Sequence, residues 1–298
     1  MIKQLSQKAI DKSNFGNLKG YINFAKEFLK FLKSDLQAVI VSQNENHYQF
    51  YQYNKEGNFR ITRPINSNLM YDAKTYNKAA REFLKIAKNI KTIDKRDASI
   101  REIINNFIYT TQQSIGAALD ALPAGKANTA RKLNGDLFED FIRLIIKSIG
   151  LKCTSGVVKL PVIVDDKELF KMSYQHDLII EDGDNVKVIG SIKTSSKDRI
   201  DKIFIDKFLH NKLKETETPH IAIFLNDVQR KNTKKENKYG INATFLPGHF
   251  KGYTVKLNPI DGVYYCDIRP NMRTEDILKD HIDTFDKLLV EDIWELIK

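Results

Sequence analysis

The segment from His176 to Asp206 limits the possible folds of this chain more than any other. Asp177 opens one aliphatic run, and fifteen residues separate it from Lys193, which closes a second run that begins at Val186. These runs predict two neighbouring strands, and the amphipathic pattern after Lys193 predicts a helix. A carboxylate and an ammonium at the ends of neighbouring strands suit metal-dependent phosphodiester chemistry. The carboxylate holds a hard cation, and the lysine lies near the attacking water or the phosphate.

Length and charge set wider limits. The 298 residues are enough for one large domain or two ordinary ones, and a hydrophobic content of 42% is enough for a sizeable core. A formal charge of +10 favours a polyanionic partner such as nucleic acid. The same charge is also typical of a soluble, lysine-rich protein, so composition alone leaves both interpretations open.

The cysteines and the N-terminus indicate the compartment. Cys153 and Cys266 are too few for a disulfide framework or a zinc site. Charges at Lys3, Lys8 and Asp11 are incompatible with the apolar core of a signal peptide. The sequence has no apolar run of the length that a membrane span needs. We therefore expect a cytoplasmic protein without membrane contact.

The first 120 residues are expected to be mainly helical. The predicted elements are a helix from Leu18 to Leu32, a strand at Ala38–Val41, a hairpin of His47–Tyr53 with Asn58–Thr62, and helices at Tyr76–Ile90 and Ser99–Leu119. A break at residues 121–125, with Pro123 and Gly125, is the best boundary. We assign residues 1–120 to a helical region that serves dimerisation or clamps DNA, and 121–298 to catalysis and DNA recognition.

The second part is expected to form a central mixed β-sheet flanked by helices, which is an α/β fold. A helix at Asn134–Ile149 precedes the strands, and another near Asp198–Lys214 interrupts them. The predicted strands are Gly156–Val164, Met172–Glu181, Val186–Lys193, His220–Leu225, Ala243–Leu246, Tyr253–Lys256 and Val263–Asp267. Two helical runs close the chain.

This order of elements resembles the PD-(D/E)xK nuclease core of type II restriction endonucleases. The resemblance covers roughly residues 134–225 and rests on Glu139 in the first helix, His176-Asp177 in one strand and Ser191-Ile192-Lys193 in the next. Two positions depart from the family pattern. His176 stands where the family has proline, and Ser191 stands where it has an acid two residues before the lysine.

One subgroup of these enzymes has Ser or Ala in place of that acid, and its missing carboxylate lies on the following helix. Asp206 is the matching candidate, although the family usually has Glu there. At about 100° per residue, Arg199 and Asp206 lie within about 20° of one another around this helix. Asp201 falls on the opposite flank of its apolar face. The resemblance therefore implies that Asp177 and Asp206 bind Mg²⁺ while Lys193 acts on water and phosphate.

Each of these residues also has a purely structural interpretation. Asp177 could end a strand or form an ion pair with Lys193, and Asp206 could be a solvated helix carboxylate. Glu139 could lie on the surface, or near the metal as a catalytic group, as the family often has it. An unneeded ammonium at Lys193 would be costly in the buried strand that its aliphatic neighbours predict.

Two groups of polar residues are candidates for DNA contact. The first surrounds the catalytic lysine and comprises Ser191, Thr194, Ser195, Lys197 and Arg199. The second belongs to a basic segment that follows the predicted strand at 220–225, and comprises Arg230, Lys231, Lys234, Lys235 and Lys238. Such side chains suit phosphate and base-edge contacts. A solvated loop, or a pair between Arg199 and a neighbouring acid, is the competing interpretation.

The resemblance implies a Mg²⁺-dependent type II restriction endonuclease that cleaves double-stranded DNA at a specific sequence. A homodimer fits a palindromic site, because each subunit would cut one strand. A DNA methyltransferase acting on the same site is the expected companion in a restriction-modification system. Two alternatives stay open: a repair or recombination nuclease with the same core that selects DNA structure, and a non-catalytic DNA-binding protein with a decayed core.

Overall fold

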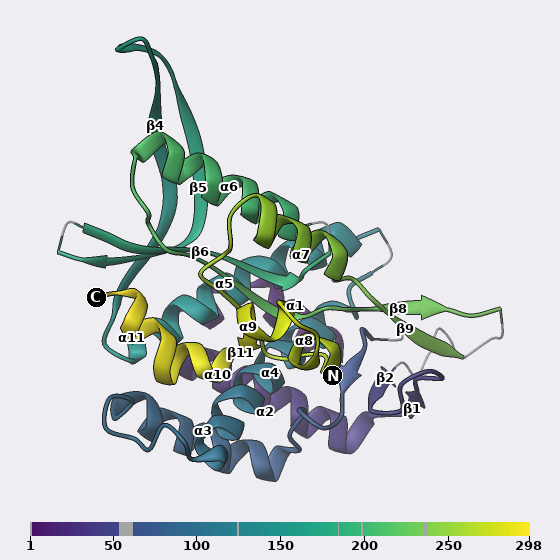
Figure 1. Cartoon of the computed structure of the whole chain (residues 1–298). Helices are drawn as coiled ribbons and strands as arrows, with labels where there is room; N and C mark the ends of the chain where they lie inside the picture. Colours follow the sequence, from purple (N-terminus) through teal and green to yellow (C-terminus); the bar gives the residue numbers. More distant parts are fainter. Residues whose placement is uncertain (1, 54–61, 124, 184, 198, 235–237) are drawn as a thin grey trace. The chain divides into compact units, whose positions relative to one another are not determined.

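The computed structural model describes residues 2–53, 62–123, 125–183, 185–197, 199–234 and 238–298 (Figure 1). Backbone contacts group the chain into two compact units. The first unit contains residues 1–145 and 228–244, and the second contains residues 146–227 and 245–298. The division into functions at residue 120 stays a prediction.

Long helices make up most of the first unit, as the sequence predicts. They are α1 (Ile2–Ile10), α2 (Leu18–Asp35), α3 (Ala73–Lys88), α4 (Ala98–Leu119) and α5 (Ala127–Ser148), the last of which runs on into the second unit. Asn17, Asp72 and Asp97 cap α2, α3 and α4 by accepting hydrogen bonds from backbone N–H groups of the first turn. α5 begins seven residues earlier than the apolar stripe from Asn134 indicated.

Two small sheets complete the first unit. β1 (Ala38–Val41), β2 (Tyr48–Gln52) and β3 (Ile65–Asn66) form an antiparallel sheet. The first strand of the predicted hairpin is confirmed as β2. Of the second, Asn58–Thr62, only Thr62 belongs to the described residues, and it is not in a strand. β8 (Val228–Asn232) and β9 (Tyr239–Ala243) form a separate ribbon.

The second unit is built on a six-stranded mixed sheet, as predicted. Its order is β11-β10-β7-β6-β5-β4. The strands are β4 (Lys152–Val164), β5 (Lys167–Asp182), β6 (Asn185–Ser195), β7 (His220–Asn226), β10 (Gly262–Tyr265) and β11 (Ile282–Thr284). β4, β5 and β6 pair antiparallel, and β6, β7, β10 and β11 pair parallel.

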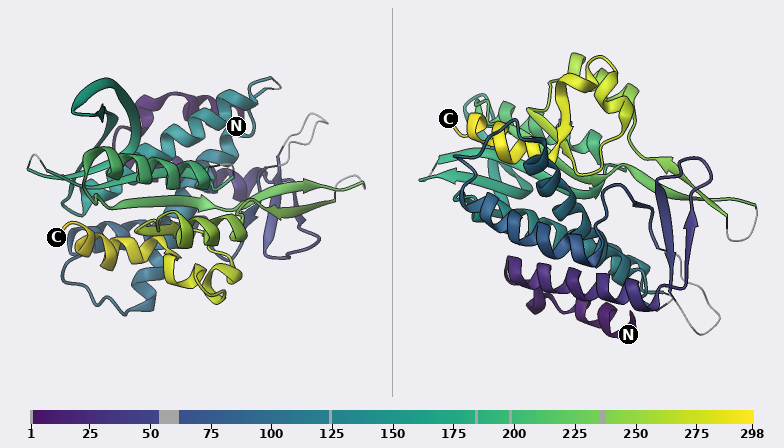
Figure 2. Two further views of the ribbon diagram at one scale, coloured as in Figure 1. Left: turned by 45° about the horizontal axis from the view of Figure 1, so that its top comes forward. Right: turned by 90° about the horizontal axis from the view of Figure 1, so that it is seen from below.

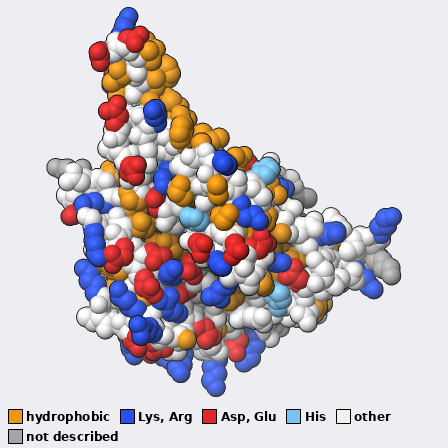
Figure 3. Space-filling view, viewed as in Figure 1, with side chains coloured by type: hydrophobic (Ala, Val, Ile, Leu, Met, Phe, Trp, Pro, Cys, Tyr) orange, Lys and Arg blue, Asp and Glu red, His pale blue; other side chains and the backbone are white. Residues whose placement is uncertain are grey.

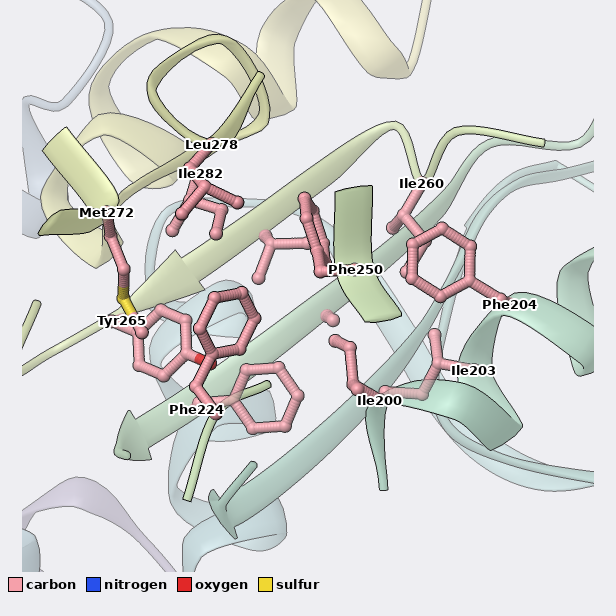
Figure 4. Packing of buried hydrophobic residues seen from close by; sticks show 13 residues of the cluster. Ile200, Ile203, Phe204, Phe224, Phe250, Ile260, Tyr265, Met272, Leu278 and Ile282 are labelled. Carbon is pink, nitrogen blue, oxygen red and sulfur yellow. The ribbon is translucent and has the colours of Figure 1, made fainter. Parts of the chain in front are cut away.

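Two helices cover one face of this sheet. α6 (Ile200–Lys214) and α7 (Pro247–Lys256) contribute Ile203, Phe204 and Phe250 to a buried cluster with Phe224 of β7 and Tyr265 of β10 (Figure 4). Burying apolar side chains of this size stabilises the fold by about 2 kcal/mol each. α6 therefore has a fixed position over β7 and β10 of the sheet.

Short helices close the chain where two helical runs were expected. They are α8 (Pro270–Thr274), α9 (Leu278–His281), α10 (Phe285–Lys287), a π-helical turn (Leu288–Asp292) and α11 (Ile293–Leu296). The hydroxyl of Tyr264 donates to Asp292 at 2.9 Å, which fastens this end of the chain to β10. None of the helices formed by the described residues is long and apolar enough to cross a membrane.

Two predicted strands are wrong. Ala243 ends β9 and the chain then leads into α7 at Pro247, while Tyr253–Lys256 forms the last turn of α7. Tyr, Thr and Val favour strands by intrinsic propensity. Here Phe250 and Thr254, four residues apart, are buried on one side of a helix, so tertiary packing overrides that propensity.

Candidate active site

A β-bulge places Asp177. Thr154 of β4 lies opposite Ile179 of β5, but Gly156 lies opposite His176. Two residues of β5, Asp177 and Leu178, therefore face one residue of β4, Ser155. Pairing of β5 with β6 also begins only at Leu178, opposite Gly190. A bulge interrupts the ladder and redirects a side chain. Asp177 therefore lies where β5 and β6 separate.

The carboxylate of Asp177 occupies the gap between the two strands. Its Oδ2 accepts a hydrogen bond of 2.9 Å from the backbone N–H of Ile192 and one of 2.5 Å from the Nζ of Lys193. The first bond gives the N–H group of Ile192 a partner in place of a carbonyl of β5, which does not pair with β6 at this point. The side chain of Asp177 is 11% exposed and that of Lys193 is 30% exposed, so this ion pair is shielded yet open to solvent at the ammonium.

The two acids of α6 have different surroundings. Asp206 forms an ion pair with Lys202, one turn earlier on the helix, and its side chain is largely shielded. His210, one turn later on the same side of α6, has its ring centroid 5.4 Å from that of His176 on β5, so Asp206 lies on the side of the helix toward the sheet. Asp201 is more exposed and has His249 as its neighbour, 3.8 Å away. Asp206 thus lies on the β5 side of α6, and its role as a metal ligand stays a prediction.

His176 directly precedes Asp177 on β5, and its ring centroid lies 5.4 Å from that of His210 on α6. Burial is the main influence on its pKa and lowers it, while the charges of Asp206 and Asp177 act in the opposite direction. Both carboxylates are therefore close enough to act on one imidazole. Two carboxylates suit a hard cation such as Mg²⁺, which prefers oxygen ligands and keeps several waters. Among the described residues, no group of three or more His, Cys, Asp or Glu side chains forms a complete metal site.

Three buried histidines form a cluster next to this site, which the sequence did not reveal. The ring centroids of His176, His210 and His220 lie 5.4 to 5.8 Å apart. Burial lowers the pKa of His210 to about 4 and that of His220 to about 2. The three imidazoles are therefore neutral at physiological pH. They come from β5, α6 and β7, and no sequence pattern links positions so far apart.

The polar residues around Lys193 lie on one stretch of chain between β6 and α6. Ser191 and Thr194 lie within β6 and are half-buried. Ser195 ends β6, and its hydroxyl accepts a hydrogen bond of 3.2 Å from the N–H of Lys197. Arg199 is exposed and precedes the first turn of α6. These residues flank Lys193 along the chain, and their contact with DNA stays a prediction.

Glu139 belongs to the first unit and lies in α5, with a half-buried side chain next to the fully buried Phe138. Its neighbour Asp140 pairs with Arg143, and Asp136 pairs with Lys12 at 2.7 Å. The role of Glu139 near the metal therefore stays a prediction.

The basic segment includes strand β8 and the first residue of β9. Arg230 and Lys231 lie in β8, and Lys234 and Lys238 lie in the connection to β9. Lys235 lies outside the described residues. Arg230 also lies over the ring of Tyr239, 5.4 Å from its centroid.

The ribbon is fixed at its base. Val228 and Ile241 pack with Tyr48 and Phe50 of β2, and Asn44 exchanges two hydrogen bonds of 2.9 Å with the backbone of Ile241. The ribbon thus lies beside the strands β1 and β2 (Figure 2). The strand that carries Arg230 and Lys231 is therefore anchored to the sheet of β1 and β2, which suits contact with a phosphate backbone.

Comparison with known proteins supports the fold. The chain is similar to the crystal structure of the type IIP restriction endonuclease Kpn2I, with a TM-score of 0.74 and 18% identity over 99% of this chain and 97% of that one. A complex of the restriction endonuclease PspGI with substrate DNA aligns at a TM-score of 0.43 and 13% identity, over 75% of this chain and 92% of that one. No family model and no curated protein matches the sequence. The chain has a restriction-endonuclease-like fold.

Proposed function

We propose that this protein is a Mg²⁺-dependent type II restriction endonuclease of the PD-(D/E)xK superfamily, in the subgroup whose second acid lies on the following helix. The observation that carries the proposal is the pair of Asp177 and Lys193 at the bulge where β5 and β6 separate. A shielded carboxylate next to a partly exposed ammonium is the arrangement that phosphodiester hydrolysis needs.

Asp177 and Asp206 would hold Mg²⁺, which when bound supplies a positive charge at the scissile phosphate and lowers the pKa of water. Asp177 also positions Lys193 through their hydrogen bond. The Nζ of Lys193 can donate to a phosphate oxygen as negative charge develops there, and can orient the attacking water. Ile192 fixes the carboxylate from the backbone, so the site is organised before DNA arrives.

DNA would be held by the polar residues around Lys193 and by the basic ribbon of β8 and β9. Ser191, Thr194, Ser195, Lys197 and Arg199 would contact the strand being cut, and Arg230, Lys231, Lys234, Lys235 and Lys238 would contact the duplex further along. Lysine and arginine contacts to phosphate fix the register of the protein on DNA. Glu139 is a further candidate near the metal.

The proposal includes a homodimer in which each subunit cuts one strand of a palindromic site. Residues 1–120 would support dimerisation or clamp the DNA. A companion DNA methyltransferase that modifies the same site would protect the host genome.

The test is incubation of the protein with phage DNA and Mg²⁺, followed by sequencing of the fragment ends. Ends that share one short sequence support the proposal. Cleavage only at branched or damaged DNA would indicate a repair or recombination nuclease. DNA binding without any metal-dependent nicking would indicate a non-catalytic protein with a decayed core.

A further inference from the structure

The two faces of the β8–β9 ribbon differ in chemistry. Residues that lie directly opposite one another in an antiparallel pair share a face. Arg230 lies opposite Ile241, and Tyr239 lies two residues before Ile241 on β9, so these three side chains share one face, called the packed face below. Gln229 lies opposite Asn242, and these two share the other face, called the amide face.

The packed face is turned toward the first unit's own sheet. Ile241 belongs to the buried cluster with Tyr48 and Phe50 of β2, and the ring of Tyr239 lies 5.6 Å from that of Phe50. The guanidinium of Arg230 lies over the same tyrosine ring. The amide face is therefore turned away from β2.

The amide face is open to solvent. Asn242 and Lys231 are exposed, and Gln229 is half-buried. Gly240 lies opposite Lys231, and a Cβ atom at this glycine would lie only 2.8 Å from the Oδ1 of Asn44. The side chains that this face presents are thus two carboxamides and one ammonium.

The charge of the ribbon favours a polyanion as its partner. The described residues from 228 to 234 and from 238 to 244 include four basic side chains and no acidic one. Basic side chains lie at the end of the ribbon, at the right of the view in Figure 3. A stable protein interface needs an apolar centre, and the described residues of the amide face include no apolar side chain. Nucleic acid therefore fits this face better than another protein does.

The dimensions and the donors suit the major groove of DNA. This groove is about 12 Å wide and admits a two-stranded ribbon. Side chains on one face of a strand recur about every 7 Å, which is twice the spacing of about 3.4 Å between base pairs. A carboxamide has a donor and an acceptor side by side, as the N6 and N7 edge of adenine does, so the two can form a pair of hydrogen bonds. An ammonium has donors only.

We propose that the amide face lies toward the floor of the major groove and that Gln229 and Asn242 read adenine, so that the recognition site includes an A·T pair. Lys231 and Arg230 reach the phosphates on either side of the groove. This inference rests on the DNA binding in the proposed function, and it deepens that function by naming two residues that determine specificity.

The test is selection of bound sequences from a randomised duplex library by the full chain without Mg²⁺. The sequences bound by the wild type should share an A·T pair at a fixed position. Asn242→Ala should reduce the preference for one such pair by about tenfold or more, and so should Gln229→Ala. Asn232→Ala is the matched control, because Asn232 is exposed, lies opposite Tyr239 and so belongs to the packed face. It should keep the wild-type preference.

A second measurement tests the contact at the level of atoms. Replacing the adenine of the pair that Asn242→Ala relaxes by 7-deazaadenine removes the N7 acceptor and keeps the base pair. The wild type should bind this DNA about tenfold more weakly, whereas Asn242→Ala should bind both DNAs equally.

Three results would overturn the inference: a wild type without preference for an A·T pair, unchanged preference in both Asn242→Ala and Gln229→Ala, or an equal loss of preference in Asn232→Ala. Cleavage assayed with Mg²⁺ on the same samples keeps the two proposals apart. A nuclease whose site is the same in all the variants refutes only the assigned readers, whereas sequence-specific binding without cleavage refutes only the nuclease.

Discussion

The buried histidine cluster predicts that the second unit loses stability in mild acid. Unfolded histidine has a pKa near 6.5, whereas His210 and His220 have folded pKa values of about 4 and about 2. A base whose pKa is depressed on folding contributes full stability above its unfolded pKa, and the stability falls as the pH drops toward the folded value. Acidification should therefore favour the unfolded chain, which binds more protons.

The expected magnitude follows from these pKa values. Between pH 7 and pH 5 each of the two histidines should lower the free energy of unfolding by about 2 kcal/mol, or about 4 kcal/mol together. Trp294, the single tryptophan, lies in α11 of the second unit, so its fluorescence reports urea unfolding of that unit. The measured quantity is the difference in unfolding free energy between the two pH values.

His210→Leu is the informative variant. Neither ring nitrogen of His210 has a hydrogen-bond partner among the described residues, so an apolar side chain of similar size should be tolerated at neutral pH. Between pH 7 and pH 5 the variant should lose about 2 kcal/mol less stability than the wild type does, because it lacks the contribution of His210. His249→Ala, at an exposed position, is the control and should behave like the wild type. The reasoning is refuted if His210→Leu retains the full pH dependence.

Two further predictions concern the proposed site. Asp206→Ala should abolish Mg²⁺-dependent cleavage in a plasmid assay, because Asp206 lies on the β5 side of α6. Asp201→Ala should reduce cleavage only mildly, because Asp201 lies near His249 instead. The reverse result would exclude Asp206 as the displaced acid. Replacing Lys231, Lys234 and Lys238 by alanine should weaken DNA binding and reduce the slope of log K against log salt by about 2.7, as for three lost phosphate contacts, and an unchanged slope would show that the ribbon does not touch DNA.

The sequence predicted the elements whose apolar pattern is local. The strands around Asp177 and Lys193 and the helix that carries Asp206 were all found from periodicity within a few residues of their observed bounds. The turn at Asp165-Asp166 was missed, because two aspartates in the left-handed region carry no glycine or proline signal. The β8–β9 ribbon has no local sequence signal, because its support by Tyr48 and Phe50 comes from distant parts of the chain.

In the candidate site, too, some features follow from local sequence and others only from the fold. The sequence places Asp177 and Lys193 at the ends of neighbouring strands, and the structure brings the two side chains into contact, while their catalytic role stays a prediction. The bulge that redirects Asp177 depends on how β5 is aligned with β4 and β6, which no single strand encodes. The histidine cluster depends on three elements meeting in space, so it could emerge only from the fold.

The central claim is that Lys193, positioned by Asp177, takes part in DNA cleavage, and the most direct test is cleavage and DNA binding of Lys193→Ala in parallel. We expect cleavage to fall by on the order of a thousandfold or more, while DNA binding stays within about threefold of the wild type. Lys187→Ala is the control, because Lys187 lies on the same strand and donates instead to the carbonyl of Lys298. Cleavage by Lys193→Ala at more than about a tenth of the wild-type rate would contradict the account.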